Sequence, residues 1–191
     1  MPPLCPKCGL PQSSATLCPS CVGWEAEIDG IRSPFRFDGV IRKAIHELKY
    51  RNLRAIAGLL AQLLNDYLIA NPVPREVVVA VPLHPKRLRE RGYNQSSLLA
   101  KELGKLANLP VVDDCLVRAR HSPPQARTAT VDERRTNVAD AFSCRDLRLE
   151  NKQVLLIDDV STSGATLDGC ARALKKAGAT SVWGLVLARE I

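Results

Sequence analysis

One stretch of thirteen residues, VLLIDDVSTSGAT at positions 154–166, constrains the fold more than any other part of the chain. Its first four residues are all apolar and predict a strand of a parallel sheet that is buried on both faces. Asp158 and Asp159 follow where this strand is expected to end, and a loop of hydroxyl side chains around Gly164 comes next. Apolar residues at helical spacing then predict a helix over 166–177. Because backbone N–H groups at the start of a helix attract anions, this order of elements predicts a phosphate-sized binding site.

The acidic pair is unusual beside a phosphate site, because carboxylates repel phosphate. It is explained if the ligand also carries sugar hydroxyls or a metal ion. The stretch resembles the signature of type I phosphoribosyltransferases, whose ligand is 5-phosphoribosyl-1-pyrophosphate (PRPP). The resemblance implies that Asp158 and Asp159 face the ribose hydroxyls as catalytic residues. It also implies that the 5′-phosphate is wrapped by Ser161, Thr162, Ser163, Gly164, Ala165 and Thr166. The alternative is an ordinary strand-to-helix turn with two exposed aspartates.

Thr162 narrows the expected chemistry. Purine-type members of the resembled family place an aspartate at this position, where it assists proton transfer at the purine ring. A threonine hydroxyl has no comparable basicity near neutral pH. The sequence therefore disfavours a 6-oxopurine acceptor, although the loop still resembles one that binds PRPP.

The composition bounds the class of protein. With 191 residues, 46% of them hydrophobic, the chain is long enough for one domain with a core and a small appendage. No apolar stretch approaches the ~20 residues that a membrane span needs, and the first residues lack the features of a signal peptide. We therefore expect a cytoplasmic protein without membrane insertion.

Four of the seven cysteines lie in two CxxC pairs near the N-terminus, namely Cys5, Cys8, Cys18 and Cys21. Two such pairs supply four thiolates to one tetrahedral ion, and so short a segment needs the metal in order to fold. We expect a structural zinc site in a zinc-ribbon-like segment over 1–25. An iron–sulfur cluster and two redox pairs are the alternatives. The other cysteines are expected to be small buried hydrophobes: Cys115, Cys144 and Cys170.

Strands and helices alternate through the remaining domain, residues 26–191. This alternation predicts an α/β fold with a central, mostly parallel sheet flanked by helices. Besides the elements around 154–166, strands are expected at 35–37, 77–81, 116–119 and 181–188. Helices are expected at 40–48, at 53–69 and after Asn94, whose side chain is expected to cap the helix that follows. Ligands of such sheets bind beyond the carboxyl ends of the strands.

Basic residues give the chain a net charge of +7, which suits nucleic acid or a polyanionic small molecule. They gather in two clusters: Lys86, Arg87, Arg89 and Arg91, and Arg118, Arg120, Arg127, Arg134 and Arg135. The first cluster overlaps a loop expected at 82–87, PLHPKR. Phosphoribosyltransferases hold pyrophosphate in the loop after an early strand, so the resemblance implies that Lys86 and Arg87 bind the pyrophosphate of PRPP. The alternative is a loop with solvated charges.

A wider resemblance links these features. Residues 81–95, VPLHPKRLRERGYNQ, resemble the central motif of the ComF family, and Gln125, Arg134 and Asn137 match that family's spacing. The resemblance covers nearly the whole chain. It implies a zinc-binding N-terminus joined to a type I phosphoribosyltransferase fold. It also implies that the three matching residues beyond position 120 belong to a segment that closes over the site or contacts DNA.

The resemblance implies a function as well. We expect a ComF-like protein that binds PRPP with Mg²⁺ and takes part in DNA uptake and natural transformation by processing incoming single-stranded DNA. A helicase-like ATPase is the expected partner. Two alternatives stay open. One is a phosphoribosyltransferase of nucleotide or cofactor metabolism that acts on an acceptor other than a 6-oxopurine. The other is a non-catalytic module that binds PRPP and single-stranded DNA.

Overall fold

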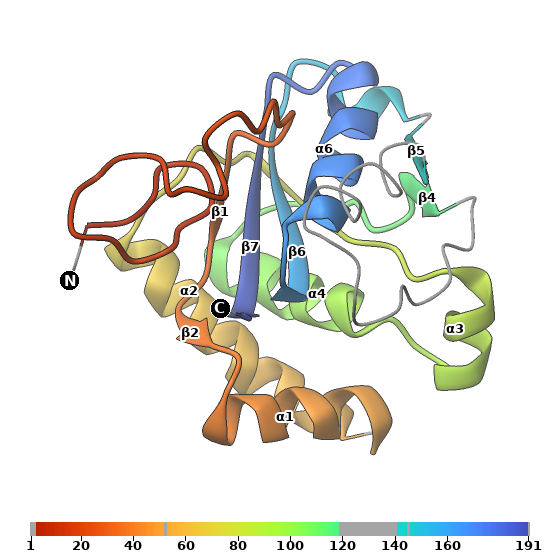
Figure 1. The fold of residues 1–191 in the computed structure, drawn as a ribbon. Helices are drawn as coiled ribbons and strands as arrows, with labels where there is room; N and C mark the ends of the chain where they lie inside the picture. Colours follow the sequence, from red (N-terminus) through yellow and green to blue (C-terminus); the bar gives the residue numbers. More distant parts are fainter. Residues whose placement is uncertain (1–2, 52, 119–140, 145, 191) are drawn as a thin grey trace.

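A parallel sheet forms the centre of the molecule (Figure 1). The computed structural model describes residues 3–51, 53–118, 141–144 and 146–190. Within them, four strands lie in the order β1 (Gly30–Arg32), β7 (Ser181–Arg189), β6 (Gln153–Ser161) and β3 (Val77–Ala80). A short strand, β2 (Phe35–Arg36), also pairs with β7, and every pairing in this sheet is parallel. The predicted α/β fold with a mostly parallel sheet is therefore confirmed.

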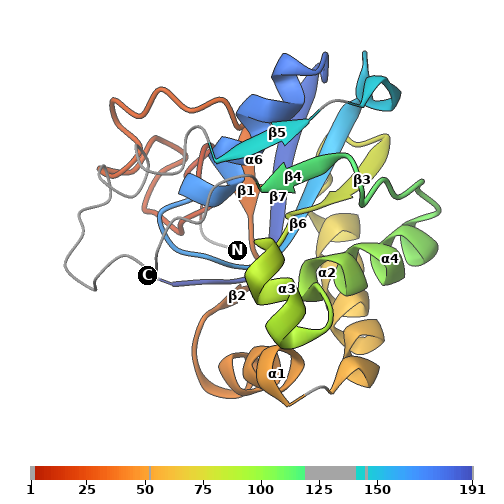
Figure 2. The same cartoon turned by 90° about the vertical axis from the view of Figure 1, so that its right-hand side faces the viewer.

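Helices and a small hairpin cover the two faces of the sheet. One face packs against α1 (Gly39–Tyr50), α2 (Ala57–Ala70) and α4 (Gln95–Ala107). The other face packs against α6 (Ala165–Lys176). Figure 2 shows an antiparallel hairpin, β4 (Leu116–Arg118) and β5 (Phe142–Cys144), lying over α6. Short 3₁₀ turns, Arg54–Ile56 and Leu147–Leu149, complete the described elements. No helix in the described ranges is both long and apolar enough to cross a membrane.

The two-sided core explains why β6 begins with an uninterrupted apolar run. Val154 and Leu156 belong to the core under α6, whereas Leu155 and Ile157 belong to the core under α1, α2 and α4. All four side chains are fully buried. Because successive side chains of a strand point to opposite faces, a strand covered on both sides must be apolar at every position.

Truncating the central strand should destabilise the protein strongly. We expect Leu156→Ala to lower the free energy of unfolding by about 3 kcal/mol, because it leaves a cavity in a fully buried site. Leu59→Ala on α2 is the matched control, since Leu59 is 67% exposed. Denaturant unfolding of both variants checks this, and equal midpoints would contradict it.

The prediction of a loop over 82–87 is wrong for the second half of that range. Residues Pro85–Arg91 form helix α3, which places Lys86 and Arg87 in its first turn. Pro85 is suited to the first helical position, and the Nδ1 atom of His84 accepts a hydrogen bond from the backbone N–H of Lys86 at 3.2 Å. Pro85 and His84 were predicted to be loop residues, but they form the N-terminus of this helix.

The end of β6 also differs from expectation. The strand continues to Ser161, so Asp158 and Asp159 lie within it rather than after it. Pairing with β7 extends this far, with Asp158 opposite Val186 and Ser161 opposite Arg189. The helix that follows begins one residue earlier than predicted, at Ala165.

Candidate functional site

Asp158 and Asp159 are held by partners from two different helices. The Oδ1 atom of Asp158 accepts hydrogen bonds from Ser96 Oγ at 2.8 Å and from the backbone N–H of Asp159 at 2.9 Å. The Oδ2 atom of Asp159, which is only 3% exposed, lies 2.9 Å from Lys49 Nζ. Ser96 is in the first turn of α4, which Asn94 caps as predicted by accepting from the Ser96 N–H at 3.0 Å. Towards its carboxyl end, β6 therefore carries one aspartate that is hydrogen-bonded to a hydroxyl and one that is paired with a cation.

The environment of Asp158 favours its protonated form. Removal from water is the largest cause, and the charge of Asp159 adds to it, while Lys49 and the Ser96 hydroxyl act in the opposite direction. Together they raise the pKa of Asp158 from 3.8 to about 7. A carboxyl with such a pKa in a polar site is typical of functional positions.

This raised pKa predicts a pH-dependent stability. Between about pH 4 and pH 7, the unfolded chain ionises Asp158 while the folded protein keeps it protonated, so stability should fall as pH rises. Asp158→Asn removes this penalty and keeps an acceptor for Ser96. We expect the variant to be more stable than the parent by on the order of 2 kcal/mol at pH 8, and equally stable at pH 4. Thermal unfolding across this range checks the trend, with Asp66→Asn on exposed α2 surface as the control. A difference independent of pH would contradict it.

The loop between β6 and α6 is closely packed and carries a buried hydroxyl that is not used within the described residues. Gly164 caps α6 with a left-handed backbone, φ 82°, which a side chain would strain. A Cβ atom there would lie 2.9 Å from both Trp24 and Ile31, so the loop is closely packed from behind. Ser161 is 4% exposed, and its Oγ atom has no hydrogen-bond partner within the described part of the chain. An unused buried hydroxyl beside a helix N-terminus fits a phosphate-sized ligand.

The six predicted loop residues are thus brought together, in different environments. Ser163 is buried and its Oγ accepts from the backbone N–H of Ala165 at 3.4 Å, whereas Thr162 is exposed. Ala165 is buried and Thr166 is half-buried in the first turn of α6. Of the six residues, Thr162 is the one whose side chain is exposed to solvent.

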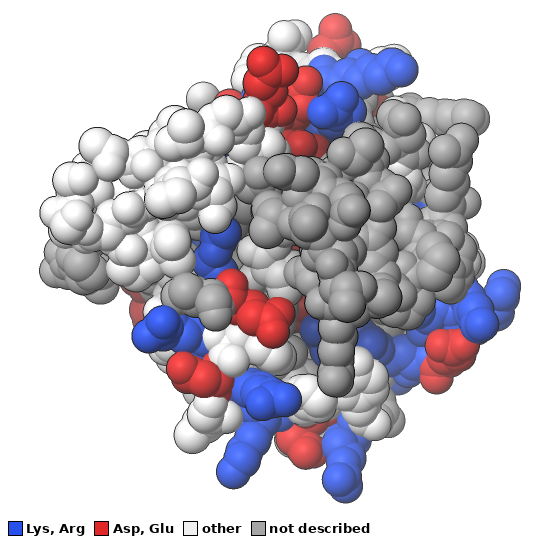
Figure 3. Space-filling view, in the orientation of Figure 1, with Lys and Arg blue, Asp and Glu red and all other residues white. Residues whose placement is uncertain are grey.

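A basic cavity of about 400 Å³ lies next to the carboxylates. It is lined by Lys49, Tyr50, Arg87, Glu90, Arg91 and Tyr93. Lys49 joins it to Asp159, so the cavity and the acidic pair are parts of one region. Lys and Arg side chains gather over α1 and α3 in the lower part of the molecule (Figure 3). The structure brings Arg87 into this region, but Lys86 does not line the cavity.

Two residues of this region, Lys49 and Ser96, were not predicted from the sequence. They come from α1 and the start of α4, far from Asp158 in the chain, and no pattern in the sequence points to either. Arg91 belongs to the predicted basic cluster, although only Lys86 and Arg87 of that cluster were predicted to bind pyrophosphate.

Arg118, at the end of β4, is a third guanidinium near this region, although it does not line the basic cavity. Its Cζ atom lies 5.3 Å from the centre of the Phe142 ring, and its buried Nε atom has no hydrogen-bond partner among the described residues. Burial lowers the pKa of Arg118, and the charge of Arg87 lowers it further. A half-buried guanidinium with an unused donor and a second one close enough to repel it fits an anionic ligand.

The four N-terminal cysteines form one cluster. Their Sγ atoms all lie within 4.8 Å of one another, and those of Cys8 and Cys18 are 3.6 Å apart. A tetrahedral zinc ion with Zn–S bonds of 2.3 Å needs sulfurs about 3.8 Å apart, so the cluster fits such an ion. Burial acts to raise the pKa of Cys5, but N–H donors of Cys8, Cys18 and Lys7 outweigh it and lower this pKa to about 7. The cysteines could therefore hold zinc, as the sequence predicts.

The remaining cysteines behave as predicted in part. Cys115 and Cys170 are buried, whereas Cys144 is only half-buried. Burial raises the pKa of Cys115 to about 12, which keeps this thiol protonated and unreactive. Three predicted site residues, Gln125, Arg134 and Asn137, lie outside the described residues.

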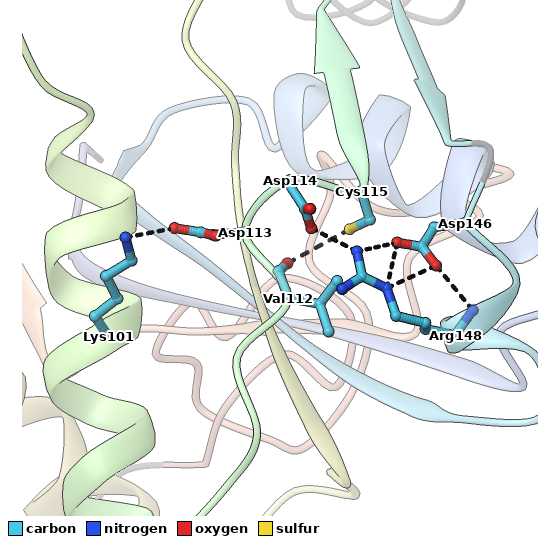
Figure 4. A network of polar contacts seen from close by, with 7 residues as sticks. All are labelled: Lys101, Val112, Asp113, Asp114, Cys115, Asp146 and Arg148. Carbon is cyan, nitrogen blue, oxygen red and sulfur yellow. Dashed lines mark hydrogen bonds and ion pairs between the residues drawn. The ribbon is translucent and has the colours of Figure 1, made fainter.

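A polar network near the hairpin has a structural role (Figure 4). Arg148 lies 2.6 Å from Asp114 and also pairs with Asp146, which ties the segment before β4 to the segment after β5. Lys101 on α4 lies 2.8 Å from Asp113. Because each of these ion pairs has at least one exposed side chain, Arg148 or Lys101, the pairs add little stability.

Comparisons with known proteins identify the domain and the family of the chain. A family model described as the phosphoribosyl transferase domain matches residues 45–190. Competence protein F of Haemophilus influenzae is 32% identical over 97% of this chain and 85% of its own length. Competence protein ComFC of Bacillus subtilis is 30% identical over 98% of this chain and 78% of its own length. The glutamine PRPP amidotransferase of B. subtilis is similar over 70% of this chain and 26% of its own, with 20% identity and a TM-score of 0.47.

The matched domain defines the class of protein. Strands β3, β6 and β7, the loop and the acidic pair lie within the matched range, whereas β1 and β2 precede it, and the chain carries a type I phosphoribosyltransferase fold. It belongs to the ComF family, as the matches over nearly its whole length show.

Proposed function

We propose that this protein binds PRPP with Mg²⁺ at the carboxyl ends of β6 and β3 and acts on incoming single-stranded DNA during DNA uptake. One observation carries the PRPP proposal: an acidic pair, a loop at a helix N-terminus and a basic cavity meet near the carboxyl end of β6. The ion pair of Lys49 and Asp159, at 2.9 Å, joins the cavity to the acidic pair. Those three parts match the sugar, the phosphate and the pyrophosphate of PRPP.

Each part of the ligand has a proposed partner. The 5′-phosphate occupies the loop from Ser161 to Thr166, where the buried Ser161 hydroxyl is an unused donor. The ribose hydroxyls donate to Asp158 and Asp159. The pyrophosphate lies over the basic cavity, held by Arg87, with Lys86 further out on the same helix. Carboxylates and phosphate oxygens are the ligands that Mg²⁺ prefers, and the ion bound to PRPP would neutralise charge on the pyrophosphate.

The proposed chemistry is transfer of the phosphoribosyl group. Arg87 and Lys86 stabilise the negative charge that develops on the departing pyrophosphate. The ribose carbon becomes cation-like, and the carboxylates orient its hydroxyls and stabilise that charge. The acceptor is a group other than a 6-oxopurine, because Thr162 offers no base for purine chemistry.

The setting in DNA uptake is supported by the relatives. Two of them are named competence proteins, and others, such as one from Escherichia coli at 28% identity, are named DNA utilization protein YhgH. The basic surface over α1 and α3 suits phosphate contacts with single-stranded DNA. We further propose a helicase-like ATPase as partner, a cytoplasmic location, and two units, a zinc-binding segment 1–25 and a phosphoribosyltransferase domain 26–191.

Titration with Mg²⁺–PRPP tests the proposal. We expect Arg87→Ala to weaken PRPP binding about 10- to 30-fold, since it removes a charge-assisted contact to phosphate. Arg89→Ala is the matched control, because Arg89 is exposed on the same helix and does not line the cavity. Calorimetry measures both affinities. Absence of PRPP binding by the parent protein, or equal effects of the two variants, would contradict the proposal.

Release of pyrophosphate separates the proposed functions. Incubation with Mg²⁺–PRPP and single-stranded oligonucleotides should release pyrophosphate if DNA is the acceptor. Release with a free base or nucleotide alone would favour a metabolic phosphoribosyltransferase. PRPP and oligonucleotide binding without any release would favour a non-catalytic module.

A further inference from the structure

Arg189 contacts both the cysteine cluster and the loop between β6 and α6. Arg189, at the end of β7, donates a hydrogen bond from Nη1 to the backbone carbonyl of Cys8, one of the four clustered cysteines. Its Nη2 atom donates to the carbonyl of Thr162 in the loop at 3.4 Å. Strand pairing sets Arg189 opposite Ser161, and the N–H of the next residue, Glu190, donates to Ser161 O at 3.0 Å. One guanidinium therefore spans two sites that are far apart in the sequence.

The same two sites also meet through packing. The backbone N–H of Ile31 donates to the carbonyl of Lys7, between the first two cysteines, at 2.7 Å. The side chain of Ile31 and the ring of Trp24 then lie directly behind Gly164 of the loop, where a Cβ atom would be 2.9 Å from each. The loop thus rests on residues that the cysteine cluster positions.

A third connection runs to the helix behind the loop. Asp168, in the first turn of α6 and 8% exposed, accepts a hydrogen bond from the backbone N–H of Ile28 at 3.0 Å. The chain between the cysteines and β1 is therefore fixed to α6, the helix that follows the loop.

These contacts make the two sites dependent on each other. A segment of about twenty residues cannot bury a core, so a metal bound by the four cysteines would hold the Cys8 carbonyl in place. Arg189 then has two fixed acceptors, and its second N–H group holds the Thr162 carbonyl and keeps the loop in one shape. A loop that is already ordered binds its ligand at lower entropic cost.

We propose that Arg189 is a positioning residue that couples the cysteine cluster to the phosphate loop, so that metal in the cluster orders the loop and raises its affinity for the 5′-phosphate of PRPP. The part that concerns PRPP rests on the proposed function. Because linkage is reciprocal, PRPP bound in the loop raises the affinity of the cluster for the metal by the same free energy.

Hydrogen exchange of the loop amides tests the coupling without PRPP. In the metal-loaded protein, we expect Arg189→Gln to raise the exchange rates of residues 162–166 about 10-fold while one metal ion per chain is retained. Removing the metal from the parent protein should raise the same rates by as much or more. Arg36→Gln is the matched control. Arg36 lies on β2, is exposed, and stands opposite Arg189 of β7 in the strand pairing. Unchanged loop exchange in the metal-loaded Arg189→Gln variant would overturn the proposal.

A second measurement separates this proposal from the proposed function. Metal affinity is measured by competition with a chelator, with and without PRPP. We expect PRPP to raise the metal affinity about 5- to 10-fold in the parent protein and not in Arg189→Gln. An equal rise in both would overturn the coupling. If PRPP does not bind the parent protein but Arg189→Gln still loosens the loop, the proposed ligand is wrong and the coupling stands.

Discussion

Joint replacement of Asp158 and Asp159 by asparagine is expected to lower PRPP-dependent pyrophosphate release by about 100-fold, equivalent to ~3 kcal/mol. The assay is run at pH 8, above the pKa of Asp158, which is about 7. Asparagine still accepts hydrogen bonds from ribose hydroxyls but carries no charge to stabilise a cation-like ribose carbon. Initial rates at saturating and limiting PRPP measure the effect, and we expect kcat to fall more than the affinity for PRPP.

Controls keep this result specific. Asp159→Asn leaves Lys49 without its ion-pair partner at 2.9 Å, so the single Asp158→Asn variant is measured as well and thermal unfolding confirms that both are folded. Asp66→Asn on α2 tests removal of an exposed carboxylate elsewhere. Binding to a single-stranded oligonucleotide should be unchanged or slightly tighter in the double variant, because phosphate contacts depend on the basic residues. Full release by the double variant would contradict the role of the pair.

The second large effect is expected at the cysteine cluster. We expect one zinc ion per chain in the parent protein and none in Cys18→Ser, because three thiolates and a hydroxyl hold zinc far more weakly than four thiolates. Binding of structural zinc is worth about 10–16 kcal/mol in small metal-dependent folds, so residues 3–24 should unfold in the variant and become open to proteolysis.

Metal analysis with limited proteolysis measures this. Cys144→Ser is the matched control, since Cys144 is half-buried and lies on β5, away from the cluster. Iron and acid-labile sulfide in the parent protein would show an iron–sulfur cluster instead of zinc. Full metal content in Cys18→Ser would contradict the four-cysteine site.

The sequence predicted the parts of this fold that depend on local patterns. Three local predictions were confirmed: the buried strand at 154–157, the helix that begins near residue 166, and the cap at Asn94. Strand burial, helical spacing and capping depend on residues that are close together in the chain, so the sequence alone indicates them. The cysteine pairs were equally clear, since metal ligation fixes their spacing.

The parts that were wrong or missed depend on tertiary contacts. Helix α3 was predicted as a loop because Pro85 was taken as a breaker, although it starts the helix. Lys49 and Arg189 reach the site from α1 and β7 through the packing of the sheet, and no local pattern marks them. β1 was missed because it is only three residues long and is defined by its pairing with β7.

The most direct test of the proposed site is a crystal structure of the protein soaked with Mg²⁺–PRPP. We expect the 5′-phosphate within hydrogen-bond distance of the backbone N–H groups of residues 162–166 and of Ser161 Oγ. The ribose hydroxyls should lie at Asp158 and Asp159, and the pyrophosphate should lie in the cavity beside Arg87. PRPP bound elsewhere on the molecule, or a loop that excludes it at saturating concentration, would contradict the proposed site.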